Sequence, residues 1–171
     1  ICANTHSPYT GVITKIDVAT DFNGYKKPAF FIDVEKDEWC EEIDTSEDIV
    51  REIKLSSKEI IERIKDRGIV GLGGAAFPTH VKYMIPEDKK AEYLIINAAE
   101  CEPYLTSDNR VILEHTEEVL IGIEIMKKAL NINKAKIGIE ANKPKAIEAL
   151  RKMLNQYPWT EFVPLKTKYP Q

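Results

Sequence analysis

The sequence predicts an α/β fold, with a mostly parallel sheet that carries helices on both faces and a small β-rich segment before it. Two observations carry this prediction. From residue 56 onward, stretches with helical periodicity alternate with short apolar runs typical of buried strands. The first 40 residues instead alternate apolar and polar side chains, as strands with one exposed face do.

The first predicted element is a pair of strands within residues 1–40. Two runs on either side of the turn residues Asn23 and Gly24 alternate with polar neighbours at every second position, as strands do: Val12, Thr14, Ile16 and Val18, then Phe30, Ile32 and Val34. The acidic run at 41–48 that follows has the composition of a solvated surface, so we interpret residues 41–55 as a linker.

The next element is a helix over residues 56–67. Ser56 and Glu59 have the spacing of a capping box, and three isoleucines between them and Arg67 lie on one helical face. Gly68 stands where a glycine commonly ends a helix. After the glycine-rich turn at 71–74, Pro78 is suited to the first turn of a second, short helix.

The remaining elements alternate between strand and helix. Strands are predicted at Tyr93–Ile96, Lys136–Glu140 and Phe162–Leu165, and an apolar helical stripe runs from Val119 to Leu130. A further helix, capped by Asn142 with Pro144, contains Ile147, Leu150 and Leu154. This rhythm predicts the parallel sheet.

The glycine turn at Gly71, Gly73 and Gly74 permits close approach of bare backbone to a flat or phosphorylated ligand. The spacing of its residues matches a dinucleotide-binding motif. That motif should directly follow a strand, whereas a predicted helix precedes this turn. A tight connection that uses glycine for geometry alone remains an alternative. His80, just beyond the turn, is expected on the helix surface.

A second polar motif, Asn97–Pro103, directly follows the apolar run Tyr93–Ile96. Its amide and carboxylates therefore fall at the carboxyl end of a predicted strand, which is where ligands of open α/β sheets bind. Cys101 lies within this motif, and we interpret it as a packing residue because no partner histidine is near in sequence.

Composition limits the function classes. A net charge of -4 with no basic tract argues against nucleic acid, and no apolar run has the length of a membrane-spanning helix. Three scattered cysteines fit a reducing compartment and lack the close spacing of metal or cluster ligands.

Two long motifs in order, Gly71–Lys82 and Ile96–Arg110, together with Gly138–Pro144, resemble the C subunit of the Rnf electron transport complex. The chain is more distantly similar to the flavin- and NADH-binding subunit of respiratory complex I. It departs from that relative at Leu72, Ala76 and Ala99, which replace an arginine, a glycine and an aspartate.

The resemblance implies a site for FMN between the glycine turn and the second motif, with NADH stacking on the flavin. The implied FMN-binding residues are Gly71, Gly73, Gly74, Lys82, Asn97 and Glu100. Phe77 would stack on NADH, and Glu102 would help hold its nicotinamide end. No side chain of this chain is assigned a catalytic role, and none a metal.

The resemblance also implies an organisation. Residues 1–40 would form a lipoyl-like, barrel-sandwich half-barrel, and residues 56–171 a Rossmann-like FMN- and NADH-binding domain, truncated at its C-terminal end. The family's 4Fe-4S clusters would lie outside this chain. Other Rnf subunits would be its partners and would hold it, as a peripheral protein, at the cytoplasmic face of the membrane in an NADH:ferredoxin oxidoreductase that moves ions.

Two other functions remain open at this point. The loss of an aspartate at Ala99 fits a structural or docking module that keeps the fold without a flavin. An electron carrier that serves a soluble reductase is the other.

Overall fold

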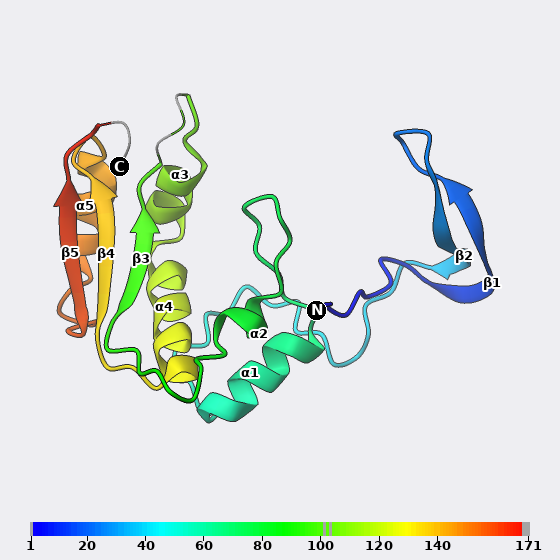
Figure 1. The fold of residues 1–171 in the computed structure, drawn as a ribbon, viewed down its shortest axis with the longest axis horizontal. Helices are drawn as coiled ribbons and strands as arrows, with labels where there is room; N and C mark the ends of the chain where they lie inside the picture. The colour runs from blue at the N-terminus through cyan, green and yellow to red at the C-terminus, as the bar shows by residue number, and fades with distance from the viewer. Residues whose placement is uncertain (1, 101, 103, 169–171) are drawn as a thin grey trace. The chain divides into compact units, whose positions relative to one another are not determined.

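A computed structural model describes residues 2–100, 102 and 104–168 of the 171-residue chain. The predicted packing role of Cys101 lies outside the described residues. The chain divides into two compact units, one formed by Thr5–Asp48 and the other by the remainder (Figure 1).

The smaller unit is a β-hairpin, which confirms the predicted strand pair. Strands β1 (Thr10–Thr20) and β2 (Lys26–Lys36) run antiparallel. In the turn, the carboxylate of Asp21 accepts the N–H groups of Asn23 and Tyr25, both at 2.9 Å, and Gly24 has a φ of +84°. That positive φ explains why glycine follows Asn23.

The strict alternation predicted for β1 is wrong at one position. The register shifts between Ile13 and Lys15, so that Ile13 lies opposite Ile32 while Lys15 lies opposite Phe31. An extra residue in one strand, a β-bulge, moves the side chains before it to the other face. Val12 therefore pairs with Asp33 rather than joining the face of Ile16.

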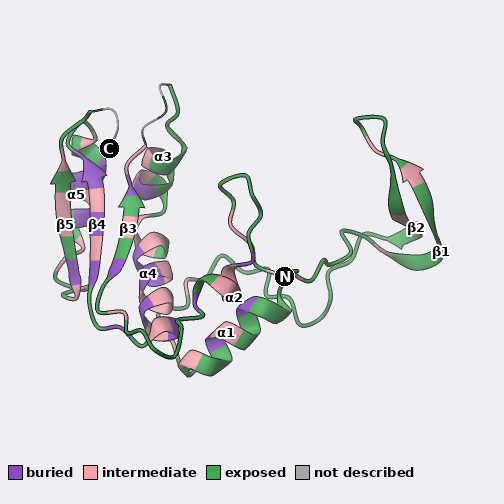
Figure 2. Cartoon of the chain, viewed as in Figure 1, coloured by how far each residue is buried: buried purple, intermediate pink, exposed green. Residues whose placement is uncertain are grey.

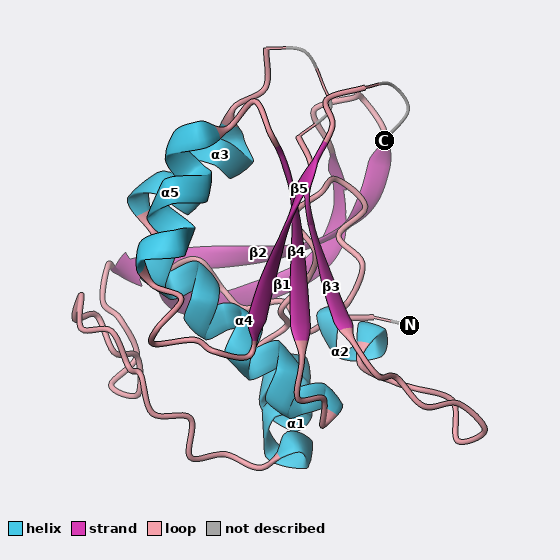
Figure 3. Cartoon of the chain, turned by 90° about the vertical axis from the view of Figure 1, so that its left-hand side faces the viewer, coloured by secondary structure: helices cyan, strands magenta, loops and turns pink. Residues whose placement is uncertain are grey.

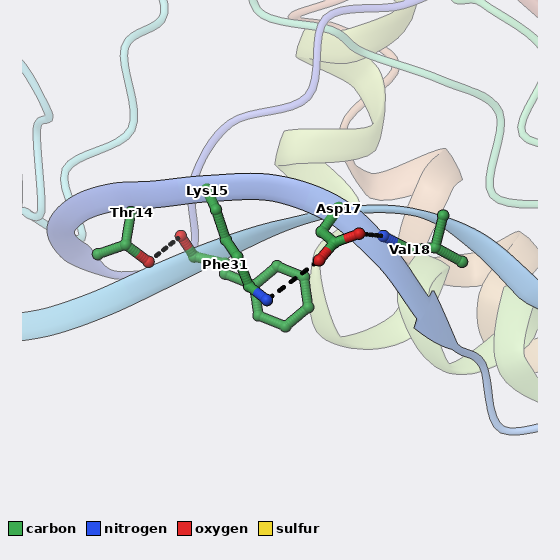
Figure 4. A network of polar contacts seen from close by, with 5 residues as sticks. All are labelled: Thr14, Lys15, Asp17, Val18 and Phe31. Atoms are coloured by element: carbon green, nitrogen blue, oxygen red, sulfur yellow. Dashed lines mark hydrogen bonds and ion pairs between the residues drawn. The ribbon is translucent and has the colours of Figure 1, made fainter.

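Polar contacts tie the bulged region together (Figure 4). The Nζ of Lys15 lies 4.3 Å from the centre of the Phe31 ring and 3.1 Å from a carboxylate oxygen of Asp17. The Thr14 hydroxyl donates to the carbonyl of Phe31 at 3.2 Å. The Val18 N–H and then Lys15 lower the pKa of Asp17, so the carboxylate stays ionised.

The larger unit contains a parallel sheet in the order β3-β4-β5, formed by Leu94–Ala98, Ala135–Glu140 and Thr160–Leu165. Three helices, α3 (Ser107–Glu114), α4 (Thr116–Leu130) and α5 (Pro144–Lys152), connect or flank these strands. The predicted Rossmann-like α/β class is confirmed, but α3, α4 and α5 pack on one face of the sheet rather than on both.

The main core lies between this sheet and the helices α3, α4 and α5, which Figure 3 shows on one side of the strands. Ile137, Ile139, Leu120 and Leu150 are each at most 1% exposed, and Figure 2 shows buried residues along the central strand and the facing helices. On the other face, Ile95 is 72% exposed. Because side chains alternate along a strand, Asn97 shares that open face.

Helices α1 (Ser57–Asp66) and α2 (Thr79–Lys82) flank the glycine loop, and Ile60, Ile64 and Tyr83 contribute to a second core with α4. The predicted capping box is present. The N–H of Ser56 donates to the Glu59 carboxylate at 2.8 Å, and the N–H of Glu59 donates to the Ser56 hydroxyl at 3.4 Å.

The predicted cap of the last helix is wrong. Lys143, not Asn142, occupies the N-cap position of α5, and no side chain caps this end. Pro144 in the first turn lacks an N–H, so one fewer donor needs a partner there. The helix ends at Lys152, before Leu154.

We expect Gly122→Ala in α4 to raise the free energy of unfolding by about 0.5–1 kcal/mol, the usual advantage of alanine over glycine inside a helix. Apart from its chain neighbours and the backbone of its own helix, an alanine Cβ at this position would have no heavy atom within 4 Å. Urea unfolding of the variant beside wild type tests this, and a lower stability would contradict the open space seen here.

Candidate functional site

The glycine-rich segment forms a closed loop between α1 and α2 (Figure 1). Val70 and Pro78 make an isolated antiparallel bridge at its base, and the N–H of Gly71 donates to the carbonyl of Phe77 at 2.8 Å. Gly74 has a φ of +107°, which side chains rarely adopt. The loop therefore keeps a defined base while its tip presents bare backbone.

Lys82 lies against this loop. A Cβ built on Gly71 would stand only 2.7 Å from the Nζ of Lys82, so the absence of a side chain at position 71 makes room for the ammonium group. A Cβ on Gly73 or Gly74 would meet no heavy atom within 4 Å. The structure thus brings Gly71 and Lys82 together beside an open stretch of backbone.

Phe77 and Leu72 extend from the same loop. Phe77 is 43% exposed although its carbonyl is tied to Gly71, and Leu72 is 96% exposed. Large apolar side chains are usually buried, so the loop offers flat apolar surface next to its glycines.

The second motif begins at the carboxyl end of β3. Asn97 is exposed, and its side-chain oxygen accepts the N–H of Ala99 at 3.0 Å. Its amide nitrogen carries two further donor hydrogens. Glu102 is also exposed, and its carbonyl accepts the N–H of Leu105 at 3.2 Å.

Glu100 is different, because its side chain is only 5% exposed. One carboxylate oxygen accepts the N–H of Asp108 at 2.8 Å and the Ser107 hydroxyl at 3.4 Å. The other lies 3.1 Å from the Nζ of Lys143. Burial raises the pKa of Glu100, but the Asp108 N–H and Lys143 outweigh it, and the pKa is lowered overall.

The site residues thus fall into two groups. Gly71, Phe77 and Lys82 meet at the glycine loop, whereas Asn97, Glu100 and Glu102 follow β3. Across the described residues, no hydrogen bond or ion pair joins the two groups.

Sequence reasoning missed the partners of Glu100. Ser107 and Asp108 begin α3, and the run from Thr106 to Asn109 has the small polar residues that favour helix starts. No comparable local signal connects Glu100 with Lys143, because 43 residues separate them.

His80 corrects another expectation. It is only 8% exposed rather than on a helix surface, and its Nδ1 has no hydrogen-bond partner. The short helix α2 packs against the second core instead of lying free, which is why its side chain is covered.

Two surface cavities lie elsewhere. One cavity of about 430 Å³ lies along the side of α1, and another of about 420 Å³ lies between residues 51–53 and α4. None of the predicted site residues lines either cavity. The described residues include no helix able to cross a membrane and no group of three or more metal-ligand side chains.

We expect the stabilising effect of Glu100 to depend on pH. Its folded-state pKa lies below the ordinary value of 4.5, so its contribution is present above that value and is lost as the pH falls through the folded-state pKa. The difference in unfolding free energy between wild type and Glu100→Gln should therefore be larger at neutral pH than in acid. Urea unfolding at several pH values measures it, and a difference that grows toward low pH would contradict the prediction.

Comparison with known proteins adds a family and a fold. The family described as the Nuo51 FMN-binding domain matches residues 64–171. Relatives include the C subunit of the proton-translocating ferredoxin:NAD(+) oxidoreductase complex of Clostridium ljungdahlii, 44% identical over 100% of this chain and 37% of the relative. The C subunit of the Na(+)-translocating complex of Acetobacterium woodii is 45% identical over 68% of this chain and 26% of the relative.

The C subunit of the ion-translocating oxidoreductase complex of Haemophilus influenzae is 40% identical over 96% of this chain and 20% of the relative. The chain thus spans between 20% and 37% of the length of these relatives. Among solved structures, an air-oxidized NAD+-reducing nickel–iron hydrogenase superposes with a TM-score of 0.52 at 20% identity, covering 65% of this chain and 20% of that one. That likeness shows the fold.

Proposed function

Since the chain belongs to the Nuo51 FMN-binding domain family and is similar throughout to C subunits of ion-translocating oxidoreductase complexes, we propose that it forms the FMN-binding part of an NADH-oxidising subunit. In this proposal the whole protein works as an Rnf-type NADH:ferredoxin oxidoreductase subunit. The proposal covers more than this chain, which spans 37% of the first relative.

The observation that carries the proposal is the space at Gly71. A side chain there would collide with the Lys82 ammonium, at 2.7 Å from its Cβ, so the loop is built to hold a positive charge against bare backbone. FMN is flat at its ring and anionic at its phosphate. A cationic group beside open glycine backbone at Gly73 and Gly74 fits such a ligand.

The second motif offers complementary polar groups. The amide of Asn97 can donate to a ring carbonyl, and Glu100 can accept from a ring N–H through the lone pair that its three donors leave unused. Phe77, being partly exposed, would stack on NADH, and Glu102 would hold the nicotinamide end.

A bound FMN would supply the redox chemistry, accepting hydride from NADH and passing electrons on toward iron–sulfur clusters that lie outside this chain. The residues of this chain would bind and orient the two flat rings. Their exposed apolar members, Phe77 and Leu72, would exclude water from the contact.

Assembly follows from the same relatives. The names of the relatives describe ion-translocating complexes, so we expect other subunits of such a complex as partners. The chain would then meet the membrane only through these partners, at its cytoplasmic face.

The test is the flavin content of the full-length protein. Denatured preparations should release FMN, identified by mass, and NADH should bleach the visible flavin absorbance of the intact protein. Protein that is folded but carries and binds no FMN would overturn the proposal. Such a result would favour the docking module, which Ala99 in place of an aspartate also fits.

A further inference from the structure

We propose that Lys143 is a positioning residue for the flavin, because its ammonium fixes and neutralises the buried carboxylate of Glu100. This inference rests on the proposed function. It assigns a role to a residue of the loop after β4, outside both motifs that carry the FMN proposal.

The geometry of the pair supports this role. Lys143 Nζ lies 3.1 Å from a carboxylate oxygen of Glu100, and the two side chains are only 17% and 5% exposed. Most other ion pairs among the described residues join well-exposed side chains, such as Lys152 with Glu148 at 72% and 67%. Exposed pairs contribute little, whereas a buried carboxylate that loses its partner is strongly unfavourable.

Lys143 is itself held in place. Its N–H donates to the carbonyl of Glu140 at 3.1 Å, at the end of β4, and it then provides the N-cap position of α5. Glu100 belongs to the loop after β3, the neighbouring parallel strand. The pair therefore links the two loops at the carboxyl edge of the sheet, where ligands of such sheets bind.

Orientation follows from how the donors are distributed. Asp108 and Ser107 occupy one oxygen of Glu100, and Lys143 approaches the other. Without Lys143, that second oxygen would lose its only described donor. The carboxylate could then rotate, and the acceptor intended for the ring N–H would no longer be fixed.

Charge is the second consequence. FMN carries more negative charge after reduction than before, and an unpaired carboxylate beside it would disfavour the reduced form. A carboxylate that is paired with an ammonium group produces only a weak electrostatic field at the flavin. Lys143 should therefore make the bound flavin easier to reduce, an effect that a purely structural ion pair far from the flavin would not produce.

The test uses the full-length protein and compares Lys143→Met with wild type, measuring the FMN dissociation constant and the midpoint potential of the bound flavin. We expect reduced FMN to lose at least tenfold more affinity than oxidised FMN, which is about 30 mV toward negative potential for a two-electron couple. Lys143→Arg, which keeps the charge, should restore most of the wild-type potential.

Lys145→Met is the matched control. Lys145 is an exposed residue of α5, and its replacement removes the same charge two positions away, so both quantities should stay unchanged. If Lys143→Met does not fold, Lys143→Gln, which keeps a hydrogen-bond donor for the Glu100 carboxylate but removes the charge, should show the same shift toward negative potential.

The outcomes separate the two proposals. Wild type without FMN would overturn the proposed function, and this inference with it. Wild type that binds FMN, with Lys143→Met at the same dissociation constant and potential, would overturn the role of Lys143 alone. A Lys143→Gln variant that folds and keeps the wild-type potential would also overturn it.

Discussion

Gly71→Ala is expected to weaken FMN binding by about 10- to 150-fold while the protein remains folded. The new Cβ would stand 2.7 Å from the Lys82 Nζ, and the flexible lysine would have to leave its place against the loop. Losing one charge-assisted hydrogen bond costs about 1.5–3 kcal/mol, which corresponds to that range of dissociation constants. Titration of flavin-free full-length protein with FMN measures the effect.

The folding control is built into the same site. The next nearest atom to the new Cβ, the carbonyl oxygen of Phe77, lies at an ordinary 3.7 Å, so we expect the free energy of unfolding to change by less than about 1 kcal/mol. Gly122→Ala, a glycine-to-alanine change with open space in α4, should leave FMN affinity unchanged. Equal affinity of Gly71→Ala and wild type would show that Lys82 does not contact the ligand from this position.

Leu150→Ala should cause the largest loss of stability, about 2–5 kcal/mol. Leu150 is 0% exposed and packs in the core between α5 and the parallel sheet. The substitution removes three buried carbons and leaves a cavity that the sheet on one side and α5 on the other cannot close. Urea unfolding with a two-state fit gives the difference.

A leucine on the surface provides the control, because its replacement by alanine removes the same atoms without leaving a cavity in the core. Leu72 lies in the glycine loop at 96% exposure, so Leu72→Ala should change the free energy of unfolding by less than about 0.5 kcal/mol. A loss of stability at Leu150 no larger than at Leu72 would contradict the position of the core described here.

The sequence predicts the elements whose signals are local. Ser56 and Glu59 specify the start of α1 three residues apart, and the structure contains both hydrogen bonds of that box. The runs that become β3, β4 and β5 are apolar enough to predict a buried parallel sheet, and the structure confirms it.

The features that the sequence does not predict depend on distant contacts. The register shift between Ile13 and Lys15 is a property of the pairing of β1 with β2, and the alternation within β1 alone does not reveal it. His80 is buried in a short helix that contacts α1, although its own neighbours in sequence favour a surface position.

The candidate site divides in the same way. The glycines are marked by their residue type, and Asn97 by its place at the end of a predicted strand. The ion pair of Glu100 with Lys143 is formed only when β3 and β4 align in parallel. A pair created by sheet topology leaves no short-range pattern, which is why Lys143 enters the site only with the structure.

A structure of the full-length protein with FMN bound would test the proposed flavin site without an intermediate step. We expect the flavin against the backbone of Gly71, Gly73 and Gly74, with Lys82 in contact and the Asn97 amide within hydrogen-bond distance. A flavin bound elsewhere, with Lys82 and Asn97 both out of reach, would contradict it.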